Sequence, residues 1–149
     1  MDKFVELVRA LGDAVGLKVD WQPLSPIELS VDGLVVVISF ERRGEADAIV
    51  IHSDLGEVPA ERELEVYRVL LEANVIWSAT RDATLAVNSA TRQALMCYRM
   101  TIKDLDGPRF VAIVSTFAQL ARGWSNVIGA AEEELAAATT VHRQGMIAG

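Results

Sequence analysis

Residues 27–53, IELSVDGLVVVISFERRGEADAIVIHS, predict three β-strands joined by two tight turns. The first strand, 27–31, alternates apolar and polar residues, as expected when one face is buried. Asp32-Gly33 is a strong hairpin signal, because glycine tolerates the positive φ that such a turn needs. The next two segments, 34–41 and 46–52, are rich in β-branched and small apolar residues. This stretch therefore predicts an antiparallel sheet at the centre of the fold.

Helical patterns flank the three strands on both sides. Before them, apolar residues recur at helical spacing from Asp2 to Val15. After them, Pro59 can open a helix, because its missing N–H would be unpaired there anyway, and we expect that helix to reach Trp77. This second helix has apolar residues over a wide arc, so we expect it to be covered on more than one side. A second subunit is a candidate for the additional cover.

The C-terminal half adds a second hairpin and a last helix. Thr84 to Val87 predicts a short strand and Gln93 to Met100 a longer one. Asp106-Gly107-Pro108 is typical of a helix start, and an alanine-rich helix can continue to Ala138. The order α-β-β-β-α-β-β-α predicts an α+β fold in which helices pack on one five-stranded, mainly antiparallel sheet.

Length and composition limit the domain organisation and the class of protein. With 149 residues, of which 51% are hydrophobic, the chain can bury one substantial core. We expect one domain over residues 1–138 and a loose tail over 139–149. No apolar run is long enough to cross a membrane, and the N-terminus lacks the layout of a signal peptide, so we expect a cytoplasmic protein without membrane contact.

The charge is unevenly distributed along the chain. Of the net −7, residues 1–58 contribute −6, from 11 acidic and 5 basic side chains. An acidic surface repels phosphate backbones, and Lys and Arg do not cluster, which argues against nucleic-acid binding. The same charge favours solubility or a basic partner.

The sequence contains no recognisable catalytic or metal-binding pattern. His52 and His142 lie far apart, and no Cys or carboxylate stands at ligand spacing from either. Cys97 is the only cysteine and lies in an apolar strand pattern, which favours a buried structural thiol over a nucleophile. Phosphate-binding loops and hydrolase motifs are missing. We therefore expect no catalytic residue, no metal and no cofactor.

Three segments together give a more specific indication. Leu70 to Trp77 (LLEANVIW), Ala83 to Val87 (ATLAV) and Gln93 to Tyr98 (QALMCY) resemble the type III secretion chaperones of the Tir-chaperone type. In that family an LL-x-x-N helix precedes a T-L-x-apolar strand, a turn and an alternating strand. The resemblance extends loosely from Phe4 to about Ala131. It departs from the family at Arg81-Asp82, where small residues are common, and in the turn after Val87, which lacks the frequent glycine.

The resemblance implies a bacterial homodimer without ATPase activity. Such a protein keeps the N-terminal part of a secreted effector extended and soluble before export, and a secretion-system ATPase is a further partner that the family suggests. In the family, effector segments wrap around the dimer and add strand-like pieces over apolar patches, which combines strand addition with side-chain pockets.

Two sets of residues are predicted to carry these functions. The effector-binding surface should combine the first helix with alternate residues of the next strands: Phe4, Leu7, Val8, Leu11, Val35, Val37, Ala48 and Val50. For the helix residues a core position is the alternative, and Phe4, near the chain end, is expected to be partly exposed. The dimer interface should include Leu70, Val75, Trp77, Leu85, Val87, Leu95 and Cys97.

Two other classes of protein remain compatible with the sequence. One is a dimeric α+β regulatory protein that binds another, folded component of a secretion system. The other is a small enzyme whose catalytic groups are dispersed along the chain, and a deep polar pocket would favour it.

Overall fold

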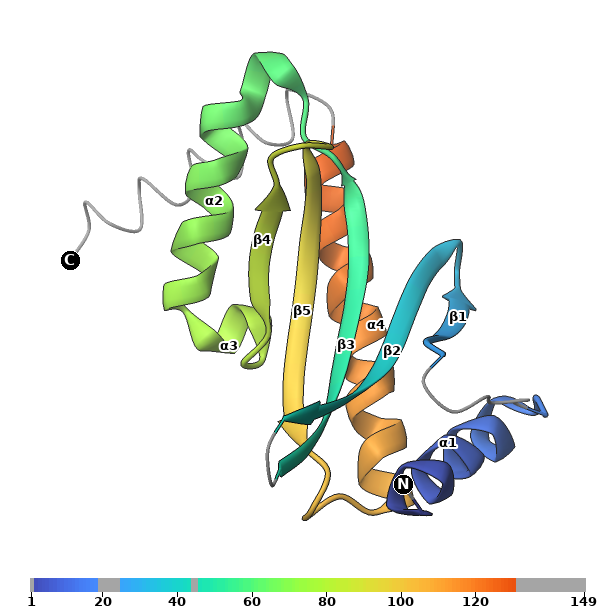
Figure 1. Ribbon diagram of the computed structural model, residues 1–149. Helices are drawn as coiled ribbons and strands as arrows, with labels where there is room; N and C mark the ends of the chain where they lie inside the picture. The colour runs from blue at the N-terminus through green and yellow to red at the C-terminus, as the bar shows by residue number, and fades with distance from the viewer. Residues whose placement is uncertain (1, 19–24, 44–45, 131–149) are drawn as a thin grey trace.

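The computed structural model describes residues 2–18, 25–43 and 46–130. One antiparallel sheet of five strands, in the order β1-β2-β3-β5-β4, organises the fold, and Figure 1 shows α4 running along one face of it. The elements are α1 (Asp2–Val15), β1 (Ile27–Val31), β2 (Leu34–Arg43), β3 (Ala46–Glu57), the 3₁₀ turn η1 (Ala60–Arg62), α2 (Glu63–Val75), α3 (Trp77–Thr80), β4 (Thr84–Asn88), β5 (Gln93–Thr101) and α4 (Gly107–Gly129). The predicted α+β class, strand number and antiparallel pairing are confirmed.

The strand register separates the two faces of the sheet. Ile38 pairs with Ile51, and Ile51 pairs with Tyr98, so these residues share one face, which we call the covered face. Their neighbours, such as Val37 and His52, pair with each other on the opposite side, which we call the open face. Side chains alternate between faces along each strand, so the register assigns every strand residue to one of the two.

The hydrophobic core lies on the covered face, beneath α4 and α1. Phe110 and Phe117 of α4 are buried there, and the Phe4 ring of α1 lies 5.2 Å from the Phe40 ring of β2. The two helices approach closely, because a Cβ on Gly107 would stand 2.7 Å from the Ala10 Cβ. Among the described elements no helix packs on the open face (Figure 1).

The prediction of one unbroken helix from Pro59 to Trp77 is wrong. The segment from Pro59 to Trp77 begins with η1, continues as α2 and breaks at Ile76, whose φ of −94° and ψ of 79° are not helical. A separate short helix, α3, begins at Trp77. The first helix has the predicted bounds, whereas β3 extends beyond His52 to Glu57 because its last residues pair with β5 through a bulge at Asp54 and Gly56. The predicted extension to Ala138 and the tail 139–149 lie outside the described residues.

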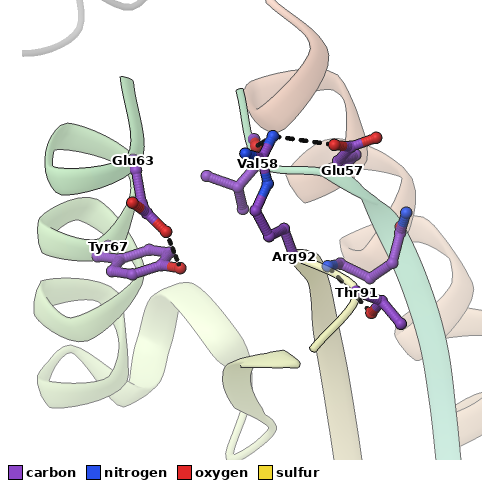
Figure 2. A network of polar contacts seen from close by, with 7 residues as sticks. Glu57, Val58, Glu63, Tyr67, Thr91 and Arg92 are labelled. Atoms are coloured by element: carbon purple, nitrogen blue, oxygen red, sulfur yellow. Dashed lines mark hydrogen bonds and ion pairs between the residues drawn. The ribbon is translucent and has the colours of Figure 1, made fainter. Parts of the chain in front are cut away.

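The turn between β4 and β5 forms without a glycine. Arg92 takes the left-handed conformation, with φ of 57°, and its carbonyl accepts a 2.9 Å hydrogen bond from the Val58 N–H. Its guanidinium donates to the Glu57 carboxylate at 2.9 Å and to the Val58 carbonyl at 3.2 Å (Figure 2). These bonds join the turn to the end of β3, which stabilises the strained backbone at Arg92.

A second polar contact in Figure 2 lies on α2. The Tyr67 hydroxyl donates a 2.7 Å hydrogen bond to the Glu63 carboxylate one helical turn earlier. Because the protonated hydroxyl is the donor, this bond raises the pKa of Tyr67 above its ordinary value.

Candidate functional site

The sheet edge at β4 is closed by a side chain of α2. The Asn74 carboxamide accepts a 2.8 Å hydrogen bond from the Leu85 N–H and donates a 2.9 Å bond to the Leu85 carbonyl. One side chain thus takes the place of a neighbouring strand at Leu85, the second residue of β4. Unpaired edge groups invite another chain to pair, so this contact opposes strand addition at β4. It also gives a structural role to the asparagine that ends the LLEAN segment.

The opposite edge of the sheet, at β1, has no such cover from the described part of the chain. The strand order ends at β1, and no described element pairs with its outer side. Next to it, Val31 and Val35 are 37% and 47% exposed, around the Asp32-Gly33 turn. A free edge beside exposed apolar side chains is the arrangement that an added strand requires.

The four predicted binding residues of the first helix do not lie at the surface. Four of its residues were predicted to bind an effector, but all belong to the core: Phe4, Leu7, Val8 and Leu11 are at most 3% exposed. The expectation that Phe4 is partly exposed is therefore wrong. A chain end lies at the surface only if nothing packs on it, and here α1 packs on α4 and Phe40, which buries these four residues, whereas Val15 at the end of the helix is exposed.

The predicted strand residues lie on the other side of the sheet from that helix. Val35, Val37, Ala48 and Val50 share the open face, because Val37 pairs with His52 and Val50 with Ser39. Val35 is exposed, Val37 and Val50 are half-buried, and Ala48 is fully buried. The first helix and these strand residues cannot form one groove, since the sheet separates them. What remains is a shallow hollow on the open face, lined by Val35, Val37, His52 and Asp54 with the β1–β2 turn.

The predicted dimer residues also divide between the two faces. Leu70 and Leu85 are buried within the subunit, and Val87 lies on the covered face opposite Ala94, so none of these three can meet a partner through the open face. Leu95 and Cys97 are half-buried on the open face, next to Ala86 and Thr84 of β4.

The outer side of α2 and the short α3 carry the strongest apolar exposure in the described chain. Val75 and Trp77 are 80% and 72% exposed, and Leu64 and Leu71 are 65% and 66% exposed. The residues at 64, 71 and 75 recur at helical spacing and form one stripe, which we call the α2 stripe. Sequence reasoning identified both apolar stripes of this helix but did not decide which of them faces the sheet.

Two observations concern metal binding and thiol reactivity among the described residues. No group of three or more His, Cys, Asp or Glu side chains within residues 2–18, 25–43 and 46–130 could hold a metal ion. Burial, followed by the charge of Asp54, raises the pKa of the Cys97 thiol, so at neutral pH the sulfur stays protonated and weakly nucleophilic.

Comparison with known proteins agrees with this geometry. The sequence profile of the Tir chaperone protein (CesT) family matches residues 6–125. The chain belongs to this family. It is a type III secretion chaperone, as the three resembling segments predicted. The matched region includes all the described elements except the beginning of α1 and the end of α4.

Solved structures show the same fold at low sequence identity. The ExsC–ExsE complex superposes with a TM-score of 0.65 at 14% identity, covering 85% of this chain and 92% of that chain. The HopA1–SchA chaperone–effector complex gives 0.63 at 9% identity, covering 83% and 94%. The ExoU–SpcU complex from the type III secretion system of Pseudomonas aeruginosa gives 0.60 at 20% identity, covering 84% and 97%. No curated protein matches the sequence significantly.

Membrane insertion finds no support in the described helices. None of them is both long enough and apolar enough to cross a bilayer.

Proposed function

We propose that this secretion chaperone works as a cytoplasmic homodimer that holds the N-terminal segment of a secreted effector in extended form until export. The observation that carries the proposal is the difference between the two sheet edges. Asn74 closes the β4 edge, whereas no described element pairs with the β1 edge, which lies beside exposed valines. The structurally similar HopA1–SchA pair is a chaperone–effector complex, which supports the same kind of partner here.

The effector segment adds as a strand to β1 in this proposal. Its backbone pairs with the free groups of Ile27–Val31, and its apolar side chains reach Val35 and Val37 in the open-face hollow. Residues 1–58 carry a net charge of −6, so a basic segment is attracted over this half of the chain. A secretion-system ATPase is the further partner that we propose from the family resemblance, and the chaperone itself acts without catalysis.

Homodimerisation uses the other end of the molecule. Exposed apolar patches of this kind mark interaction surfaces in soluble proteins. The α2 stripe, Val75 and Trp77 supply one part, and the open-face residues Leu95, Cys97 and Ala86 supply the adjoining part. A two-fold axis would place the same surface on both partners, leaving the β1 edge of each subunit free for cargo.

The test of cargo binding is co-purification from the native host, followed by hydrogen exchange on the complex. We expect a secreted protein bound through its N-terminal region, with the amides of Ile27–Val31 protected against exchange. Val35→Asp should reduce capture at least about tenfold, because it places a charge in an apolar contact. Ser115→Asp, which adds the same charge on the exposed side of α4, is the matched control for capture. A folded partner held without protection of β1 would favour the regulatory alternative.

The test of the dimer is light scattering at micromolar concentration. The wild-type mass should be about twice 16.2 kDa, and Val75→Asp with Trp77→Ser should give the monomer. Both residues are exposed in the single subunit, so the variant should keep its circular dichroism spectrum. A wild-type monomer, or a double variant that remains dimeric, would contradict this interface.

A further inference from the structure

A pocket of about 260 Å³ opens on the covered face, between α3, β5 and α4. Its floor is apolar and includes Met96, Phe117 and Leu120. It lies at the β4 end of the sheet, on the side opposite the open-face hollow, and so it belongs neither to the proposed cargo edge nor to the proposed dimer surface.

Two arginines give this apolar pocket a positive rim. Arg81, after α3, and Arg109, at the start of α4, both line it, and both residues are exposed. Neither forms an ion pair with a carboxylate of the described residues, although the chain has a net charge of −7. Four other arginines, at 42, 62, 92 and 99, each pair with a carboxylate, whereas Arg9, Arg68 and Arg122 have no such pair among the described residues. The rim therefore offers two guanidinium groups to an anion from outside.

The backbone at the rim is held in an unfavourable conformation. Arg81 has φ of 50° and Asp82 has φ of 67°, in the left-handed region that normally takes glycine at a helix end. The family resemblance also leads us to expect small residues here. Strained backbone concentrates at functional sites, where it holds a side chain in place. Thr80 lies in the same wall, and its buried hydroxyl has no hydrogen-bond partner within the described chain.

The size and lining of the pocket suit a small occupant. Sites for small organic ligands usually enclose about 300–1,000 Å³, and this pocket, at about 260 Å³, lies just below that range, so it has room for one large side chain. An apolar interior with two cations at its rim matches an apolar side chain followed by a carboxylate. We propose that this pocket is a second cargo anchor, which takes a large apolar residue next to an acidic residue of the secreted effector. The proposal rests on the proposed chaperone function and specifies a site for it.

This anchor and the β1 edge engage separate parts of the effector. Three strand spacings of about 4.8 Å separate β1 from β5, and an extended residue covers about 3.3 Å, so at least about five residues must link the two segments. Two linked contacts bind more tightly than either alone, because the second becomes intramolecular. The basic segment at β1 and the acidic anchor here would also give the bound effector a defined direction.

The first experiment uses the dipeptide acetyl-Phe-Asp-amide with the ¹⁵N-labelled protein. Titration should shift the amide signals of Ala83, Met96 and Ala112, around the pocket. Acetyl-Phe-Asn-amide, which has the same shape without the charge, should bind at least about tenfold more weakly, since charged hydrogen bonds are the stronger ones. Phenylpropionate has a phenyl ring and a carboxylate but no peptide bond, and it shows whether a free acid is enough for binding to the pocket. Tighter binding by the free acid than by the dipeptide would overturn the assignment to a peptide.

Variants of the rim separate charge from structure. Arg81→Gln with Arg109→Gln should weaken dipeptide binding about tenfold or more, whereas Arg122→Gln, an exposed arginine of α4 outside the pocket, should change nothing. Ala112→Phe fills the pocket from its exposed wall and should abolish binding with both arginines intact. Arg81→Gly should raise Tm because it relieves the left-handed strain, yet weaken binding, a combination that a purely structural role does not produce.

The outcomes separate this anchor from the chaperone function itself. Weaker capture of the co-purified effector by the double arginine variant, with β1 protection kept, supports the anchor. Equal binding of the Asp and Asn dipeptides, absence of shifts at the pocket, or unchanged effector capture overturns it and leaves strand addition at β1 intact. Failure of the wild-type protein to capture any secreted protein would instead refute the chaperone proposal. The dipeptide titration could still be interpreted, because it does not use the effector.

Discussion

The covered face of the sheet is almost entirely apolar, whereas the open face mixes apolar residues with polar ones such as Ser39, His52 and Asp54. The apolar residues that the two faces share have opposite surroundings. Val36 and Ile38 are fully buried under the helices, whereas Val35, one position away, is 47% exposed. The difference comes from the packing of α4 and α1 on one side only. An apolar strand residue is thus core or contact surface according to which neighbour it meets. In a chaperone, the uncovered face is where other chains can bind.

Truncation of one apolar side chain on each face should give the largest difference in the free energy of unfolding. Phe4→Ala on the covered side should lower the free energy of unfolding by roughly 3–5 kcal/mol, because it leaves a cavity against Phe40. Val35→Ala on the open face should change it by less than about 0.5 kcal/mol. Urea unfolding at one fixed protein concentration measures both. Similar losses for the two variants would mean that the open face is covered in the folded protein.

Removal of the Asn74 side chain, which closes the β4 edge, should cause the second largest loss of stability. Asn74→Ala should cost about 2 kcal/mol, because the N–H and C=O of Leu85 both lose their partner. Asn74→Asp keeps an acceptor for the N–H and should cost less. Asn126→Ala, on the exposed side of α4, is the control. If Asn74→Ala retained full stability and remained unaggregated, the edge-closing role would be refuted.

A stabilising change on the covered side sharpens the comparison further. Arg81→Gly should raise the free energy of unfolding by roughly 0.5–1 kcal/mol, because glycine accepts φ of 50° without strain. Arg122→Gly, within α4 at ordinary helical φ, should lower it by about 1 kcal/mol. Thermal unfolding of the two variants measures the opposite signs, and a loss of stability in both would show that Arg81 makes contacts that outweigh its strain.

The smallest expected effect is a change in the alkylation rate of Cys97 on the open face. Burial and the Asp54 charge raise the pKa of its thiol, so alkylation by iodoacetamide should be slow at neutral pH and accelerate as pH rises through the alkaline range. Asp54→Asn removes the negative charge, lowers that pKa and should modestly increase the rate at a given pH. A rate that is already maximal at neutral pH would contradict this account.

Local patterns in the sequence were sufficient for most elements of this fold, but not for the break at Ile76 that separates α2 from α3. Helix α1 has the predicted ends, and the strands begin where alternation and the Asp-Gly turn place them. These features depend on near neighbours in the chain: helical spacing, β-branched runs and turn residues. The family could also be predicted from the sequence, through the LLEAN segment and the T-L strand that follows it. In the structure the Asn74–Leu85 hydrogen bonds join these two segments.

The faces and edges were decided only by tertiary structure. The run Leu34–Ile38 is apolar on both sides, so alternation contains no information about which side α4 would cover. The register between β4 and β5 placed Leu85 and Val87 on one face and Leu95 and Cys97 on the other, although all four are similar in sequence. The first helix was a plausible surface until its packing on α4 and Phe40 buried it. An apolar side chain in the sequence predicts that it will be buried. Only the arrangement of distant segments decides whether its own chain or another chain buries it.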